Sequence, residues 1–355
     1  MSLVQLFQLT VVSQHTQEFK EGSNMKIVIL GLGRMGFNMS RRLIKNGHDV
    51  FGYDKDQEKV KLLESEGAKG IRDLSEIAKI IDSPRVVWLM LPSGAITENA
   101  IEEVSRYLEP GDIVIDGSNG HYKEDKVRES KLKDKGIIYM DAGVSGGIWG
   151  YEVGYCTMIG GNKKGFKLIE PILKSLAPKE GYLYCGPSGA GHFVKMVHNG
   201  IEYAIMEAYG EGFEILKASE YSEYFKLEEI AHLWNQGSII RSWLLELLEE
   251  ALKKDPELET IQGIVPDSGE ARWTVQAAID LGVSATGIAH SLFKRFQSRQ
   301  VDVFSDKILA ALRREFGGHA VYIKGNEVRS KTAGAGPVKH ADPSEEWKIP
   351  NVEDY

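Results

Sequence analysis

The sequence has few cysteines, no long apolar run and no excess of basic residues. Two cysteines, Cys156 and Cys185, are too few for a disulfide framework or a structural zinc site, so we expect buried thiols in a reducing compartment. No apolar run reaches the roughly 18 residues of a membrane span, and residues 3–12 lack the basic flank of a signal peptide. A net charge of -8 argues against a broad nucleic-acid surface. We therefore expect a cytoplasmic protein with neither a membrane nor a nucleic-acid partner.

Glycine, by contrast, is abundant and unevenly placed. Most of the 38 glycines among the 355 residues lie at or before Gly212. Short β-branched runs alternate with amphipathic segments as far as a glycine-rich stretch at 186–191, after which the pattern is helical. This predicts an α/β doubly wound, Rossmann-type domain over 25–188 and an all-α domain over 189–330. Residues 1–24 are expected to be an N-terminal extension and 331–355 a flexible tail.

Apolar runs and helical periodicity set the expected elements. Strands are predicted near 26–30, 49–53, 86–91, 113–115, 137–140, 157–161 and 182–185. In the second domain, helices are predicted over 192–216, 227–234, 239–253, 274–281 and 285–316. Uninterrupted apolar strands alternating with helices are typical of a parallel sheet that helices cover on both faces.

A glycine-rich turn follows the first predicted strand and opens a helix. It reads Gly31, Leu32, Gly33, Arg34, Met35, Gly36. In a dinucleotide site the first glycine makes the tight turn, the second lets the backbone approach the pyrophosphate, and the third lets helix and strand pack closely. The helix N-terminus then holds the anion. A glycine turn without a ligand is the alternative, and the strand, helix and later acid together disfavour it.

The end of the second predicted strand carries that acid. Asp54, 18 positions after Gly36, is expected to accept hydrogen bonds from the adenosine ribose and to repel a 2′-phosphate, which favours NAD. Lys55 and Arg34 nearby leave NADP open as a cofactor. Leu91, Pro92 and Asn119 follow two further strands, at the edge where such sheets bind ligands, although each turn could be an ordinary one.

Two later segments carry candidate substrate groups. Ser145, Gly146 and Gly147 follow another strand, and their backbone N–H groups and hydroxyl suit a carboxylate. Polar residues also stand at i, i+3, i+4 and i+7 of an otherwise apolar helix, which places them in one stripe. The residues of this stripe are Lys195, His198, Asn199 and Glu202. A solvated, salt-bridged helix face is the alternative interpretation.

From residue 26 to about 321 the chain resembles the 6-phosphogluconate dehydrogenase family, within the β-hydroxyacid dehydrogenase superfamily. The superfamily shares the glycine turn, D-G-S-N at 116–119, V-S-G-G at 144–147 and G-x-x-x-K-x-x-x-N at 191–199. The string K-M-V-H-N-G-I-E-Y at 195–203 narrows the resemblance, because relatives that act on 3-hydroxyisobutyrate usually have Asn in place of His198. The length is similar to that of the short branch, which has a single helical repeat.

The resemblance implies a chemistry without a metal. The family oxidises 6-phosphogluconate at C3 and decarboxylates it to ribulose 5-phosphate and CO2, with reduction of NAD(P), in the pentose phosphate pathway. Lys195 would be the general base and would then stabilise the enolate, and Glu202 would protonate C1 of the enediol. The groups that would hold the carboxylate and hydroxyls are Asn119, Ser145, Gly146, Gly147, His198 and Asn199.

The same resemblance assigns the substrate phosphate. Its partners would be Tyr203, Arg272, Arg295, Arg313 and His319. The last two match the pair that the long enzymes of the family donate from a neighbouring subunit, whether or not they do so here, and we expect a homodimer or homotetramer. Arg272 stands where the family has a lysine before Trp-Thr, so the chain departs from the family's pattern there. Any one arginine alone is more often a surface ion pair. Two other functions stay open: an NAD-dependent dehydrogenase of a smaller 3-hydroxy acid, and a non-catalytic dinucleotide-binding redox sensor.

Overall fold

The computed structural model describes residues 24–317, which form two compact units. The first comprises the described residues up to Tyr203 together with Ser268–Ala289, and the second comprises Ala204–Asp267 and the described residues from His290 onward. The division falls inside helix α9 (Ala190–Ala218), since the first part of this helix packs on the sheet of the first unit. The predicted boundary at 188/189 follows the change of element type rather than the packing, and it stays a prediction.

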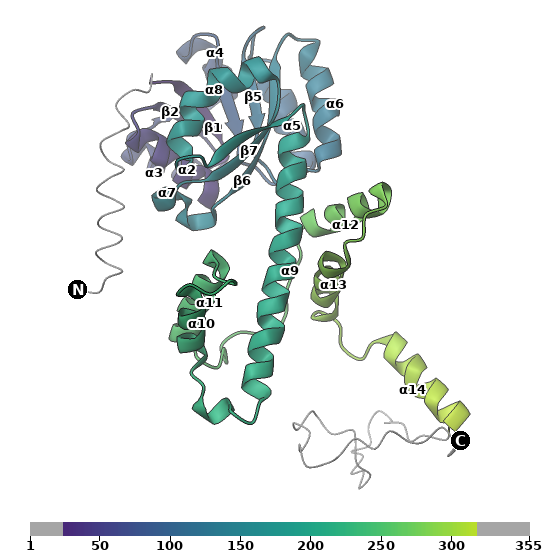
Figure 1. The fold of residues 1–355 in the computed structure, drawn as a ribbon. Helices are drawn as coiled ribbons and strands as arrows, with labels where there is room; N and C mark the ends of the chain where they lie inside the picture. The colour runs from purple at the N-terminus through teal and green to yellow at the C-terminus, as the bar shows by residue number, and fades with distance from the viewer. Residues whose placement is uncertain (1–23, 318–355) are drawn as a thin grey trace, which may run out of the picture. The chain divides into compact units, whose positions relative to one another are not determined.

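The first unit is built on one sheet of eight strands in the order β3-β2-β1-β4-β5-β6-β7-β8 (Figure 1). The strands are β1 (Lys26–Leu30), β2 (Asp49–Tyr53), β3 (Lys69–Gly70), β4 (Val86–Leu89), β5 (Ile113–Asp116), β6 (Ile138–Ser145), β7 (Cys156–Gly161) and β8 (Tyr182–Gly186). The doubly wound α/β prediction is confirmed. Strand β3, an edge strand of two residues, is too short to have given a pattern in the sequence.

Helices surround this sheet and make up the second unit. The first unit contains α2 (Arg34–Lys45), α3 (Gln57–Ser65), η1 (Leu74–Glu76), α4 (Ile77–Ile80), α5 (Ala95–Val104), α6 (Tyr122–Lys133), η2 (Gly147–Trp149), α7 (Gly150–Val153), α8 (Lys163–Leu176) and α12 (Glu270–Leu281). The second contains η3 (Ser222–Tyr224), α10 (Leu227–Asn235), α11 (Trp243–Lys254) and α14 (Phe304–Gly317). Helix α13 (Thr286–Gln297), like α9, has residues in both units.

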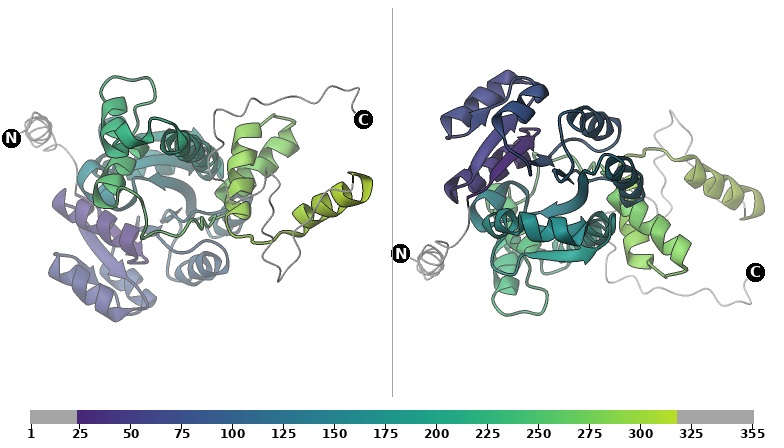
Figure 2. Two further views of the ribbon diagram at one scale, coloured as in Figure 1. Left: turned by 90° about the horizontal axis from the view of Figure 1, so that it is seen from below. Right: turned by 90° about the horizontal axis from the view of Figure 1, so that it is seen from above.

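Both faces of the sheet are buried, as the apolar strands require. Along β1, Ile27 and Ile29 join the core under α2, α3 and α8, whereas Val28 and Leu30 join the core under α4, α5 and α6. The two further views show helices on either side of the strands (Figure 2). Because successive side chains of a strand point to opposite faces, a continuous apolar run fills both cores at once.

Two of the predicted patterns are wrong in detail. Strands β6 and β7 pair antiparallel, with Ser145 opposite Cys156, so the sheet is mixed and not parallel throughout. The ten residues between them are fewer than the dozen or more that a parallel crossover needs. The segment 285–316 is two helices, α13 and α14, separated at 298–303, where Asp302 has a φ of 56° that no helix tolerates.

The expectation of buried thiols is also wrong. Cys156 is exposed and Cys185 is half-buried. The reason is position: Cys156 opens β7 opposite Ser145, the last residue of β6, and Cys185 belongs to β8, which is an edge strand. Among the described residues, no helix is both long enough and apolar enough to cross a membrane.

Helix α9 starts directly on the sheet because glycines remove side chains from the contact. A Cβ on Gly143 of β6 would lie 2.3 Å from the Cβ of Lys195, and a Cβ on Gly191 would lie 2.5 Å from the Met158 carbonyl oxygen. The carboxylate of Asp141 accepts hydrogen bonds from the N–H groups of Gly189 at 2.8 Å and His192 at 2.9 Å. These contacts fix the register of the helix that carries the predicted catalytic stripe.

We therefore expect Gly143→Ala to destabilise the protein by about 1–3 kcal/mol, because the added methyl overpacks the contact with Lys195. Gly210→Ala is the matched control on the same helix. A Cβ at Gly210 meets nothing within 4 Å, so this change should stabilise by up to about 1 kcal/mol through helix propensity. Urea unfolding of the three proteins measures both. Equal stability of Gly143→Ala and wild type would contradict the packing account.

Candidate active site

The three glycines of the first turn occupy three different environments. Gly31 has a φ of +104°, and a Cβ there would lie 2.6 Å from the Met90 carbonyl oxygen. A Cβ on Gly36 would lie 2.0 Å from the Gly31 carbonyl oxygen, whereas Gly33 has nothing within 4 Å. Helix α2 has no side-chain cap and no acid in its first turn. An open backbone at an uncapped helix N-terminus fits the pyrophosphate of a dinucleotide.

The predicted cofactor residues meet at one edge of the sheet. Backbone hydrogen bonds join the ends of neighbouring strands: Gly31 N to Tyr53 O at 2.8 Å, Met90 N to Leu30 O at 2.8 Å, and Gly117 N to Leu89 O at 2.9 Å. The carboxyl ends of β2, β1, β4 and β5 therefore lie in a row, with the turns that carry the predicted residues beyond them. These residues are Gly31, Leu32, Gly33, Arg34, Met35, Gly36, Asp54, Leu91, Pro92 and Asn119.

Asp54 holds the glycine turn in place. Its Oδ2 accepts the Leu32 N–H at 2.8 Å and its Oδ1 accepts the Asp56 N–H at 2.9 Å, while the Lys59 ammonium lies 3.6 Å from Oδ1. Each carboxylate oxygen has a second lone pair, so Asp54 can also accept from a ribose hydroxyl. The hydrogen bonds by which Asp54 holds the glycine turn therefore leave it able to accept another from the ribose of NAD.

The predicted stripe on α9 is a hydrogen-bonded group. The Lys195 Nζ donates to Asn199 Oδ1 at 2.6 Å, and His198 Nδ1 lies 3.1 Å from the same oxygen. Because that oxygen only accepts, Nδ1 carries a proton, and Nε2 lies 3.5 Å from the Ser145 hydroxyl. Glu202 lies 3.8 Å from His198 Nδ1 and is partly exposed. These five side chains form one polar surface.

Lys195 is suited to proton transfer. Its side chain is buried, and this burial lowers the pKa of Lys195 below its ordinary value, opposed by the charges of Glu202, Glu270 and Cys156. A buried amine with a lowered pKa can be neutral near physiological pH and accept a proton. A solvated salt-bridged face, the alternative interpretation of the stripe, does not account for a buried lysine whose hydrogen-bond acceptor is a neutral amide.

A buried charged network lies one helical turn before Lys195. His192 Nδ1 is 2.9 Å from Asp125 Oδ2, and Arg128 is 2.8 Å from Asp116 Oδ2. Burial alone would lower the pKa of His192, but the hydrogen bond and charge of Asp125, with those of Asp116 and Asp141, raise it to about 9. Burial raises the pKa of Asp141 to about 6. The ring of His192 is thus a cation at neutral pH, held by Asp125.

The N-terminus of α12 packs beside the stripe. The Thr274 hydroxyl donates to the Met196 carbonyl at 2.8 Å, and Tyr203 OH lies 3.2 Å from the Ser268 hydroxyl. Glu270 is buried there. Arg272, one of the predicted phosphate groups, is on the same helix and exposed. The structure thus brings Ser268 and the start of α12 to the part of α9 that carries Met196 and Tyr203.

The remaining predicted phosphate groups belong elsewhere in the chain. In the second unit, Arg295 donates to the Pro266 carbonyl at 3.0 Å, and Arg313 is exposed on α14. His319 lies outside the described residues. The roles assigned to these three residues stay predictions.

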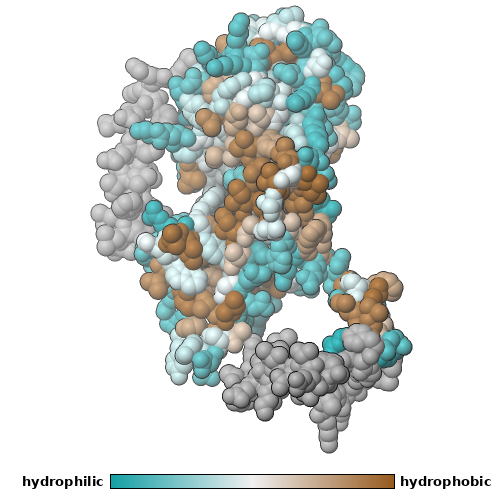
Figure 3. Space-filling view, turned by 45° about the vertical axis from the view of Figure 1, so that its right-hand side comes forward, coloured by the Kyte–Doolittle hydropathy of each residue, from teal (hydrophilic) through white to brown (hydrophobic). Residues whose placement is uncertain are grey.

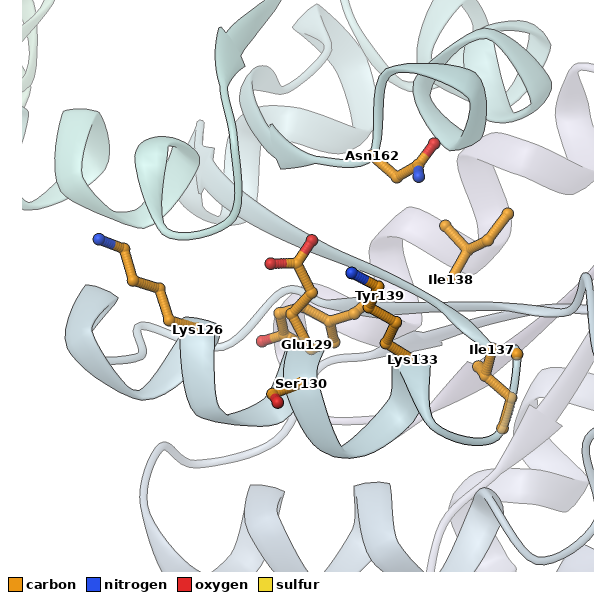
Figure 4. Close-up of a pocket in the computed structure, with 9 residues that line it drawn as sticks. Lys126, Glu129, Ser130, Lys133, Ile137, Ile138, Tyr139 and Asn162 are labelled. Carbon is orange, nitrogen blue, oxygen red and sulfur yellow. The ribbon is translucent and has the colours of Figure 1, made fainter.

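The structure also has two cavities that contain none of the predicted residues. One, of about 420 Å³, lies between α6 and the beginning of β6, with Lys126, Glu129 and Lys133 on one side and Asn162 on the other (Figure 4). The other, of about 500 Å³, is an apolar cavity among α9, α10 and α11 in the second unit.

Two models of one protein family match the chain, one over each of its two parts. Residues 26–186 match the family model for the NAD binding domain of 6-phosphogluconate dehydrogenase, and residues 191–315 match the C-terminal domain of the same family. The chain belongs to the 6-phosphogluconate dehydrogenase family. It is thus related to NAD(P)-dependent oxidoreductases, and its first part is an NAD-binding domain.

Similar proteins of this family fall into two lengths. YqeC of Bacillus subtilis (strain 168) is 46% identical over 296 residues, which cover 83% of this chain and 99% of that protein. The NAD(+)-dependent, decarboxylating 6-phosphogluconate dehydrogenase of Haloferax volcanii is 38% identical, covering 84% of this chain and 98% of the relative. The solved 6-phosphogluconate dehydrogenase of Plasmodium falciparum is 28% identical, with a TM-score of 0.71. The match covers 85% of this chain and 67% of that one, which is the longer protein.

Several buried charged residues at the site were not predicted from the sequence, among them Asp125 and Arg128 of the network. Asp141 had a signal, as a lone acid inside an apolar strand, and an acid there must meet donors. His192 opens the helix predicted over 192–216, one turn before Lys195, and no role was predicted for it. Glu270 gave no signal, because acids in the first turn of a helix are ordinary.

The network predicts a pH dependence of stability. A histidine whose pKa rises from 6.5 to about 9 on folding contributes stability that is complete below pH 6.5 and is lost as the pH rises to about 9. The free energy of unfolding should fall by roughly 3 kcal/mol across this window.

Replacement of the histidine tests this directly. In His192→Gln the fall between pH 6.5 and 9 should disappear, whereas in His232→Gln, which removes an exposed histidine that pairs with Glu249 at 3.0 Å, it should remain. Urea unfolding at four or five pH values measures it. A slope that persists in His192→Gln would contradict the assignment.

Proposed function

We propose that this chain catalyses the oxidative decarboxylation of 6-phosphogluconate to ribulose 5-phosphate and CO2, with NAD as the preferred cofactor. The observation that carries the proposal is the buried Lys195, which bonds to Asn199. The same Asn199 oxygen meets His198, and His198 in turn meets Ser145. Family membership and the 38% identity to an NAD(+)-dependent, decarboxylating relative support it.

The cofactor binds at the carboxyl edge of the sheet, and when bound it supplies the hydride acceptor. Gly33 and the first turn of α2 would hold the pyrophosphate, since that backbone is open and uncapped. Asp54 would accept from the ribose, and Leu91, Pro92 and Asn119 would lie on the nicotinamide side.

Lys195 takes the first proton. Its neutral amine accepts the proton of the C3 hydroxyl while the hydride leaves C3 for the cofactor, which makes a 3-keto acid and an ammonium. Asn199 keeps the amine in place through the bond of 2.6 Å. Ser145, Gly146, Gly147 and His198 hold the carboxylate and neighbouring hydroxyls.

The same ammonium then assists decarboxylation. The C1–C2 bond breaks and CO2 leaves. The electron pair of that bond forms the enolate, and the Lys195 ammonium stabilises the enolate oxygen. The amine and ammonium forms thus serve successive steps, and a lowered pKa of Lys195 suits this exchange. Glu202 delivers the proton to the carbon that becomes C1 of ribulose 5-phosphate. We assign the phosphate to Tyr203, Arg272, Arg295, Arg313 and His319.

We further propose that the protein works as a homodimer or homotetramer, with Arg313 and His319 reaching the neighbouring subunit's site. Helix α14 supports this, because Phe304, Ile308 and Leu312 recur at every fourth position and are all exposed, Phe304 at 74%. The side of the molecule drawn in Figure 3 shows patches of hydrophobic surface, coloured brown. Exposed apolar helix faces of this kind are normally covered by a partner.

Replacing the base tests the reaction. Lys195→Met should lower kcat/KM for 6-phosphogluconate by about 10²–10⁴-fold, measured as NADH formation with identification of ribulose 5-phosphate. Lys217→Met is the control: this lysine also belongs to α9 but pairs with Glu257 at 2.6 Å in the second unit, so activity should be unchanged. Wild type without NAD-linked turnover of 6-phosphogluconate, or Lys195→Met at full rate, would contradict the proposal.

Cofactor choice is tested at Asp54. Asp54→Asn keeps an oxygen for the Leu32 N–H but removes the charge that repels a 2′-phosphate, so the ratio of kcat/KM for NADP over NAD should rise about tenfold or more. Asp56→Asn, two residues along, is the control, because Asp56 caps α3 and should leave the ratio unchanged. A wild type that already prefers NADP would refute the argument.

A further inference from the structure

Glu270 is a buried carboxylate beside the catalytic stripe that the proposed reaction leaves unused. It is the first residue of α12 and only 2% exposed. Its Oε2 accepts a hydrogen bond from the Ser268 hydroxyl at 2.5 Å. Its Oε1 is buried and has no hydrogen-bond partner among the described residues. A carboxylate oxygen left unpaired in the interior is costly, and no contact that the structure describes for this oxygen offsets that cost.

The start of α12 is fixed against the turn of α9 that carries Lys195. The Thr274 hydroxyl donates to the Met196 carbonyl at 2.8 Å, and the same hydroxyl lies 2.9 Å from the Glu270 carbonyl oxygen. A Cβ on Gly200 would lie 2.9 Å from the Thr274 side chain, so the two helices touch closely here. Ser268 is itself held by Tyr203, whose hydroxyl accepts the Ser268 N–H at 3.2 Å. Glu270 therefore has a fixed position.

We propose that Glu270 is a positioning residue for Lys195: its buried negative charge, held by Ser268, sets how readily the Lys195 amine takes up a proton. This inference rests on the proposed function, in which Lys195 alternates between amine and ammonium. Burial pushes the lysine toward the amine, and a fixed carboxylate on α12 opposes it.

The charged and titratable groups around Lys195 come from three elements. Glu202 and His198 lie on α9, Glu270 on α12, and Cys156 at the start of β7. Of the two carboxylates, Glu202 is partly exposed and is assigned a proton transfer of its own. Glu270 is the buried one, so water screens its charge less.

A helix-terminal role is the competing explanation, because an acid in the first turn favours the helix dipole. The two explanations differ in what they change. A dipole partner affects the stability of α12 only, whereas an electrostatic partner of Lys195 affects the pH at which the lysine titrates.

The test is the pH profile of kcat/KM for Glu270→Gln, which removes the charge and keeps the size. We expect its acidic limb to move to lower pH by at least about half a unit, since the amine form is favoured once the carboxylate is gone. Glu270→Asp keeps the charge but withdraws it by one methylene, so its limb should move the same way by less. If Glu270→Gln does not fold, the pH profile of Glu270→Asp provides the test.

The control is Glu249→Gln, which removes another largely buried carboxylate, on α11 in the second unit. Its acidic limb should coincide with that of the wild type. A folded Glu270→Gln enzyme with an unchanged acidic limb would overturn the inference and leave Glu270 as a helix-terminal acid.

A measurement without substrate separates this inference from the proposed function. The Lys195 ε-carbon, followed by NMR in protein with ¹³C-labelled lysine and assigned with Lys195→Met, reports its titration directly. A lower midpoint in Glu270→Gln than in wild type supports the inference even if 6-phosphogluconate is not turned over. Equal midpoints refute it even if the enzyme is active.

Discussion

The candidate site depends on how Asp141 and the glycines around it hold the first turn of α9. The Asp141 carboxylate accepts hydrogen bonds from the N–H groups of Gly189 and His192. These groups would otherwise be unpaired donors at the buried start of the helix. Gly143 and Gly191 let the helix backbone lie against β6 and β7. Every side chain of the stripe from Lys195 to Glu202 takes its position from this register.

Two basic side chains on successive turns of α9 have opposite pKa shifts, because they differ in the groups they bond to. His192 and Lys195 are both buried, and burial disfavours the charge of each. His192 has a carboxylate at hydrogen-bond distance, so it keeps its proton, whereas Lys195 bonds to a neutral amide and meets carboxylates only at longer range. The helix thus combines a histidine that keeps its proton at neutral pH with an amine that can exchange one.

The sequence could predict the features that short-range rules determine. The strand, glycine turn and helix at residues 26–45, the acid at 54 and the spacing of the α9 stripe follow from local patterns. In the structure the glycine turn and Asp54 follow β1 and β2, and the stripe lies on α9. The antiparallel β7 could not be read this way, because chain direction in a sheet depends on the length of a connection rather than on apolar pattern. Nor could Asp141 and Glu270, whose roles arise from packing between distant segments.

The most direct test is a crystal structure of the enzyme with 6-phosphogluconate bound. The account predicts the C3 hydroxyl at about 3 Å from the Lys195 Nζ, the carboxylate at the Ser145–Gly147 turn, and the Glu270 carboxylate buried beside them without a direct contact to the phosphate. A substrate whose C3 hydroxyl meets another base, or whose carboxylate lies away from that turn, would contradict it.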